Sequence, residues 1–174
     1  MNLFEITRYF ESKYPKDLAY DWDNVGLQVG SLNIKAKRVL ITLDVTKEVV
    51  KEAIQLKANM ILSHHPLMFT PMKTIGFDSP KGWMIKNLIK HNITVYSAHT
   101  NYDVAEGGMN DTLAKALEMK QPKLLDLNDE IGRYGDIEPV EFDQFIQNIK
   151  RQLKIDVVKV IGRDDKVIKT IGIS

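Results

Sequence analysis

Residues 61–69 read Ile61-Leu62-Ser63-His64-His65-Pro66-Leu67-Met68-Phe69, an apolar run that leads directly into two histidines and a proline. Successive side chains of a strand point to opposite faces, so neighbouring histidines share one site only where the strand has ended. Pro66 favours such an end, because it donates no backbone hydrogen bond and biases His65 towards an extended conformation. We predict a buried strand that stops at Ser63. His64 and His65 beyond it either hold a metal ion or are ordinary polar residues at a strand end.

Two further apolar segments predict strands on either side of this one in the chain. Residues 39–43 form a strand that closes at Asp44, with Thr46 as a plausible N-cap of the next helix. Residues 93–97 form a third strand, which opens into the segment Ala98-His99-Thr100-Asn101-Tyr102-Asp103. Apolar residues at helical spacing predict helices over 49–57, 83–89 and 109–117, with His91 at a helix end. The alternation of strand and helix predicts an α/β fold with a mainly parallel sheet and helices on both faces.

The predicted sheet gathers several possible ligands at one edge. In such sheets ligands collect outside the carboxyl ends of the strands. Five chemically suggestive side chains from three strands fall there: Asp44, His64, His65, His99 and Asp103. Imidazole and carboxylate donors without thiolates suit Zn²⁺, Mn²⁺, Fe²⁺, Co²⁺ or Ni²⁺ better than Ca²⁺ or Mg²⁺.

Two loops complete the first part of the chain. A helix over residues 2–13 ends at Tyr14-Pro15, and residues 20–30 predict a loop that enters a short strand. That loop is either a turn anchored by Trp22 or a segment that brings Asp23 or Asn24 near the site. The long connection over residues 67–80 is a candidate lid or subunit contact.

The character of the sequence changes after residue 125. We therefore expect an α/β metal-binding core over residues 1–125 and a smaller α+β segment over residues 126–174. Residues 132–135 predict a short strand or turn, and residues 141–153 an amphipathic helix. Residues 157–161 and 167–173 then predict two strands joined by a turn at residues 163–165. The last strand runs apolar to within one residue of Ser174, so we expect the chain to be part of a longer protein.

Composition excludes several classes of protein. The chain has 174 residues, a formal net charge of +1 and no cysteine. It therefore carries no disulfide or thiolate site and no strong basic signal for nucleic acid. No apolar run approaches the length of a membrane span, and the amino terminus lacks a signal-peptide pattern. We expect a cytoplasmic protein that does not associate with membranes.

Four motifs, taken together and in order, resemble one known family. They are Asp21-Trp22-Asp23-Asn24-Val25-Gly26-Leu27, Leu43-Asp44-Val45-Thr46, Ser63-His64-His65-Pro66-Leu67 and His99-Thr100-Asn101-Tyr102-Asp103, with Gly107-Gly108-Met109-Asn110-Asp111 after the last. The resemblance, which covers essentially the whole chain, is to the Nif-three-like or YbgI-like dinuclear-metal proteins, often labelled GTP cyclohydrolase 1 type 2 homologues.

The resemblance implies a specific site and assembly. His64, His65 and Asp103 match the family's first three metal ligands, whereas its remaining histidine and glutamate lie in a downstream half that this sequence does not contain. His99, Asn101, Asp44 and Asn24 are candidates for second-shell or substrate contacts. Two divalent metal ions are expected in the complete protein, and a ring-shaped homohexamer is the family's common assembly.

Two classes of function follow from these expectations. The first is a metal-dependent hydrolase that acts on a nucleotide such as GTP or on a phosphoester. The second is a non-catalytic metal-binding or scaffold protein. Turnover that depends on added metal would distinguish the two classes.

Overall fold

Three parallel strands form the centre of the first part of the chain. In the computed structural model, which describes residues 1–127, 130–162 and 167–174, they are β2 (Val39–Thr42), β3 (Met60–Ser63) and β4 (Thr94–Ser97). A fourth strand, β1 (Gly26–Val29), pairs antiparallel with β4, which gives the sheet order β1-β4-β3-β2. The predicted mainly parallel α/β sheet is confirmed, and so is the end of the central strand at Ser63.

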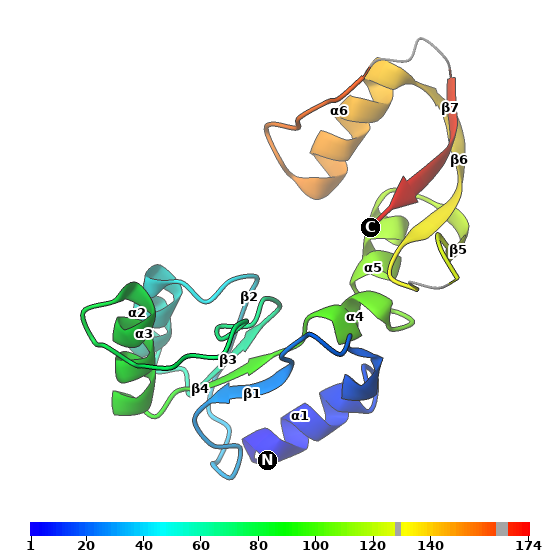
Figure 1. Cartoon of the computed structure of the whole chain (residues 1–174). Helices are drawn as coiled ribbons and strands as arrows, with labels where there is room; N and C mark the ends of the chain where they lie inside the picture. Colours follow the sequence, from blue (N-terminus) through cyan, green and yellow to red (C-terminus); the bar gives the residue numbers. More distant parts are fainter. Residues whose placement is uncertain (128–129, 163–166) are drawn as a thin grey trace. The chain divides into compact units, whose positions relative to one another are not determined.

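Helices cover both faces of this sheet because its strands alternate apolar side chains between the two faces (Figure 1). Ile61 and Val95 pack under α2 (Lys47–Gln55) and α3 (Pro80–Lys90), whereas Met60 and Tyr96 pack with Leu3 of α1 (Leu3–Glu11). The connection from β3 to α3 contains no other helix or strand.

Local capping signals explain where the helices begin. Asn2 forms a capping box with Glu5 at the start of α1, and Thr46 accepts a hydrogen bond from Val49 N at the start of α2. The Thr46 N-cap is therefore confirmed. The helix predicted over residues 83–89 begins earlier, at Pro80, because Ser79 caps it and Pro80 occupies its first turn.

Two short helices were not expected from the sequence. One is the 3-10 helix η1 (Lys16–Leu18), and the other is α4 (Thr100–Val104), which starts directly after His99. The second matters for the site, since it places Asp103 one helical turn after His99, with Asp103 N donating to His99 O at 3.1 Å.

The chain divides into two compact units, residues 1–105 and residues 106–174, earlier than the boundary expected after residue 125. The reason is that α5 (Met109–Ala116) and β5 (Lys120–Leu124) pack with the strands that follow them. β6 (Arg133–Glu141) pairs antiparallel with β5 and with β7 (Val167–Ile173), and α6 (Phe142–Leu153) packs against the same strands.

The prediction of a strand over residues 157–161 is wrong. These residues belong to no helix or strand, and Val157 and Ile161 are 81% and 87% exposed. Residues 157–161 cannot pair with β6, because β5 already occupies one edge of that strand and β7 the other. The turn expected at residues 163–165 lies outside the described residues. Within the described ranges, no helix is long and apolar enough to cross a membrane.

Candidate metal centre

The ends of β3 and β4 hold the predicted site residues in register. Ser63 and Ser97 are paired, buried and joined through their hydroxyl groups at 2.8 Å. Ser63 Oγ also donates to His65 O, and His64 N donates to Thr42 O. These contacts fix the backbone that carries both histidines after the strand has ended.

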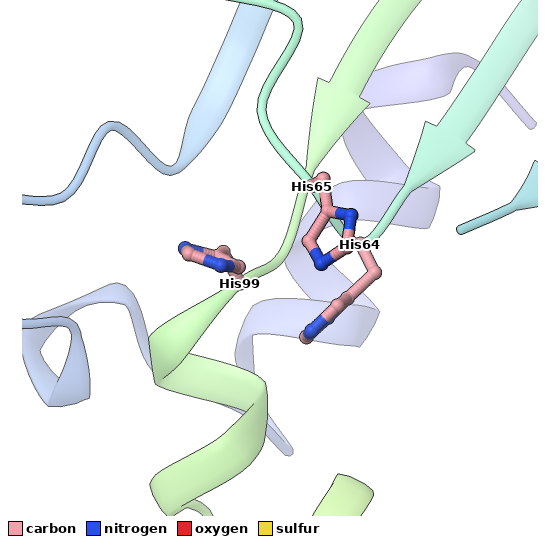
Figure 2. Close-up of side chains that lie close together, drawn as sticks. All are labelled: His64, His65 and His99. Carbon is pink, nitrogen blue, oxygen red and sulfur yellow. The ribbon is translucent and has the colours of Figure 1, made fainter. Parts of the chain in front are cut away.

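Three imidazole rings meet beyond these strand ends. His64, His65 and His99, together called the histidine cluster here, each offer a ring nitrogen, and these nitrogens all lie within 4.8 Å of one another (Figure 2). The ring centre of His99 lies 5.2 Å from that of His64 and 5.6 Å from that of His65. The adjacent histidines therefore do diverge into one shared site, as the interruption by Pro66 predicted.

In each ring of the histidine cluster, Nδ1 lies within hydrogen-bonding distance of an oxygen atom that can only accept a hydrogen bond. His64 Nδ1 donates to the Ala98 carbonyl at 2.9 Å, and His65 Nδ1 donates to Asp44 Oδ1 at 2.7 Å. His99 Nδ1 donates to the Asp23 carboxylate at 3.0 Å. Because Nδ1 must carry the proton in each bond, neutral rings keep the lone pair on Nε2. This is the arrangement in which histidine binds metal ions.

A carboxylate lies beside the cluster. Asp103 Oδ1 is 3.6 Å from His64 Nε2, and both side chains are largely buried. Two ligand atoms that each lie about 2.1 Å from a tetrahedral ion are roughly 3.4 Å apart. The separation of this pair thus suits a shared ion, and the nitrogen and oxygen donors suit Zn²⁺ and the neighbouring transition metals.

Burial shifts the pKa values of the central pair in opposite directions. Desolvation lowers the pKa of His64 below its ordinary value, although the charge of Asp103 and the bond to Ala98 oppose the shift. Desolvation also raises the pKa of Asp103, against the effect of the nearby histidines. A bound cation would oppose the shift of the Asp103 pKa, because it stabilises the ionised carboxylate, and would lower the pKa of His64 further, because it favours the neutral imidazole.

Asp23 holds His99 in the cluster, whereas the sequence predicted only that either Asp23 or Asn24 lies near the site. Burial raises its pKa, but hydrogen bonds from Thr100 Oγ1, His99 and the backbone outweigh burial and lower the pKa. It accepts from Thr100 Oγ1 at 2.5 Å and from Thr100 N at 3.0 Å. Asp23 therefore remains ionised and holds the ring of His99.

The remaining predicted residues take supporting positions. Asn101 is buried and accepts from His99 N at 3.0 Å, while its amide donates to Tyr14 O. Asp44 is half exposed and contacts His65. Asn24 does not touch the histidine cluster through any described hydrogen bond, and its amide donates to Met68 O instead. The structure thus groups His99 with His64 and His65, whereas the sequence placed it among possible outer contacts.

Comparisons with known proteins show a likeness that extends over the chain. A family model described as Duf34/NIF3 (NGG1p interacting factor 3) matches residues 1–174. A Bacillus subtilis protein named "GTP cyclohydrolase 1 type 2 homolog" is 46% identical over 121 residues, or 70% of this chain and 32% of that protein. A Lactococcus lactis protein of the same name is 34% identical over 172 residues, or 99% of this chain and 67% of that protein.

A solved structure extends the likeness to three dimensions. The Bacillus cereus "protein related to NIF3" superposes with a TM-score of 0.91 at 28% identity, covering 99% of this chain and 76% of that one. In the match to the Bacillus subtilis protein, the chain spans only about a third of the relative's length.

Proposed function

The chain belongs to the Duf34/NIF3 family, and on that premise we propose that it binds divalent metal ions at the histidine cluster and Asp103 and serves as a metal-dependent hydrolase. The observation that carries the proposal is the common orientation of the three rings. Each Nδ1 is occupied by a carbonyl or carboxylate oxygen, so each Nε2 is available as a ligand.

The number of ions follows from the donors. The ring nitrogens of the histidine cluster all lie within 4.8 Å of one another, a range that admits one ion or two. Adjacent histidines can each serve a different ion, and the ions of two-metal sites lie about 3.5–4 Å apart. Three imidazoles and one carboxylate complete one ion and leave a second under-coordinated. We therefore expect about one tightly held ion in this chain and a second, weaker one.

The reaction class rests on the metal and on the names of the relatives. A divalent ion at such a site supplies Lewis acidity for hydrolysis. Relatives named as GTP cyclohydrolase homologues suggest a nucleotide, and a phosphoester is the other substrate suited to a two-metal site.

Metal binding is tested by loading the chain with Zn²⁺ or Mn²⁺ and measuring bound metal and dissociation constants by mass spectrometry and calorimetry. We expect Asp103→Ala to lose at least tenfold in affinity. His91→Ala is the matched control, because His91 lies at the end of α3 and bonds to Asn87 O. Parental affinity in Asp103→Ala together with lost affinity in His91→Ala would place the metal elsewhere.

Hydrolysis is tested on the same preparations with GTP and a simple phosphoester. Because both ions of a two-metal site act on the reacting oxygens, we expect product only in samples that hold two ions per chain. Two bound ions without turnover across a nucleotide panel would favour the non-catalytic metal-binding or scaffold role. Equal turnover with one ion would mean that the site works with a single metal.

A further inference from the structure

Two large aromatic side chains stand exposed beside the histidine cluster. Trp22 is 58% and Phe69 is 48% exposed, and their rings meet edge to face with centres 5.8 Å apart. The ring centre of His99 lies 6.3 Å from that of Trp22 and 6.2 Å from that of Phe69. Trp22 and Phe69, called the aromatic wall here, therefore border the site that the metal proposal uses.

The wall is held in place by amide side chains. Met68 N donates to Gln28 Oε1 at 3.1 Å, and Met68 O accepts from Asn24 Nδ2 at 2.6 Å. The buried Gln28 also donates to Asn24 O at 2.7 Å. The backbone of Met68, the residue before Phe69, is thus tied through its carbonyl to the loop that carries Trp22 and through its N–H to β1, which follows that loop. Tyr20 packs against Trp22 within the same loop, with ring centres 5.4 Å apart.

The exposure of two aromatic side chains to water costs free energy that a bound ligand would recover. Exposed aromatic faces lose the free energy that burial would give, and a fixed pair next to polar ligands marks a binding site. Aromatic side chains bind planar rings by stacking and by edge contacts, and they do so at little entropic cost when they are already ordered.

We propose that the aromatic wall binds a planar heteroaromatic ring, such as a nucleobase, of a ligand whose anionic or carbonyl end reaches the metal at the histidine cluster. The inference rests on the proposed metal site and adds the residues that would hold the base of a nucleotide there. The ring centres of the aromatic wall lie 6.2 and 6.3 Å from that of His99. A compound that carries both a planar ring and an anionic group, such as a nucleotide, can therefore contact the wall and the metal site together. Trp22 and Phe69 are then specificity residues that touch the ligand.

The test compares GMP with ribose 5-phosphate, which shares the sugar phosphate but lacks the purine. The chain has two tryptophans, so Trp83→Phe leaves Trp22 as the only one and makes its fluorescence a direct probe. In zinc-loaded protein we expect GMP to quench Trp22 and to bind roughly tenfold or more tightly than ribose 5-phosphate, as base stacking on aromatic residues provides.

Calorimetry on single variants of the otherwise unchanged chain supplies the second measurement. Trp22→Ala and Phe69→Ala should each remove most of the preference for GMP while leaving zinc affinity unchanged. Phe77→Ala is the matched control, because Phe77 is similarly exposed in the same connection but lies beneath Lys86 Nζ. It should keep the preference.

The outcomes separate this inference from the metal proposal. If zinc does not bind the parental chain, the metal proposal fails. If zinc binds but GMP and ribose 5-phosphate have equal affinity, or GMP keeps its advantage in either alanine variant, the aromatic wall formed by Trp22 and Phe69 is not the ring-binding site. A shift of Trp22 emission with protein concentration alone would show that the wall covers a second copy of the chain, which also overturns the inference.

Discussion

The oxygen partners of the Nδ1 atoms decide what the three imidazoles can do. Ala98 supplies a backbone carbonyl, whereas Asp44 and Asp23 supply carboxylates. Without these partners each ring could turn over or exchange its tautomer, and Nε2 would not be directed to the shared site. Residues that never touch the metal should therefore control its affinity.

Asp23→Asn tests this control at the more buried of the two carboxylate partners. The amide retains the shape of the side chain but loses the charge, and it cannot accept at all the positions that now receive His99 and Thr100. We expect metal affinity to fall by about 10–100-fold, as is usual when such a partner is removed. Calorimetric titration with Zn²⁺ measures the change.

The exposed neighbour Asp21 provides the control, since Asp21→Asn removes the same charge from the same loop. It should bind zinc as the parent does. Parental affinity in Asp23→Asn as well would mean that the Asp23–His99 bond has no influence on the metal.

The lowered pKa of His64 gives the metal-free chain a dependence on pH. The unfolded residue takes up its proton near the ordinary value of 6.5, before the folded one does. The stability that the neutral His64 contributes is therefore complete above pH 6.5 and is lost as the pH falls below it. The raised pKa of Asp103 has the opposite effect, because the folded chain binds that proton more readily than the unfolded chain and so gains stability as the pH falls.

Urea unfolding with chelator present, for the parent and His64→Gln at pH 7.5 and pH 5.5, isolates the contribution of His64. We expect the parent to lose more stability on acidification than the variant does, by on the order of 1 kcal/mol for each unit of pKa difference. His91→Gln should follow the parent. An equal pH dependence in the parent and His64→Gln would refute this account.

At the residue scale the sequence predicted which side chains gather but not all of their roles. Adjacent histidines before a proline, and another histidine and an aspartate after a neighbouring strand, were enough to predict that these four side chains lie at one edge of the sheet. The partner of His99 comes from a loop 76 residues earlier in the chain, and only the fold brings it near. For that reason Asp23 and Asn24 could not be told apart from the sequence.

Among the elements, those with a strong apolar period were predicted well. β3 and β4 match the apolar runs, because buried parallel strands are apolar on both faces. β2 matches its apolar run as well, although it is a partly exposed edge strand rather than the buried strand that the sequence predicted. β5 has the sequence Lys-Gln-Pro-Lys-Leu and is mostly exposed, so it gives no strand signal. The sequence predicted only a short strand or turn over residues 132–135, whereas β6 runs on to Glu141 and accommodates Pro139 at an irregularity between Asp136 and Val140.

Gly30 is the glycine whose replacement tests the junction after β1. Its φ of +96° is unfavourable for other residues, and a Cβ atom there would lie 2.8 Å from Thr94 Cα. We expect Gly30→Ala to lower the free energy of unfolding by about 2 kcal/mol or more, from strain of roughly 1–3 kcal/mol with the clash added. Gly76→Ala, where nothing lies within 4 Å, should change it little. Equal unfolding midpoints for the two variants would contradict this.

For the whole molecule we propose self-association, with a hexamer as the form that the family resemblance suggests. β2 is an edge strand of the four-stranded sheet, and Ile41 and Leu43 on it and just after it are 77% and 54% exposed. Exposed apolar edges of this kind favour contacts between chains. Sedimentation equilibrium should give a mass near six chains, and Ile41→Lys should reduce it. A parental chain that stays monomeric at every concentration would disprove the proposal.

The central claim is that the histidine cluster and Asp103 hold a divalent ion, and X-ray absorption spectroscopy of the zinc-loaded chain tests it most directly. The account predicts nitrogen and oxygen neighbours at about 2.0–2.2 Å with the outer-shell scattering of two or three imidazoles. His64→Ala should lose about one imidazole from that signal, and His91→Ala should lose none. A shell of oxygen atoms without imidazole scattering, or a spectrum that His64→Ala leaves unchanged, would contradict the claim.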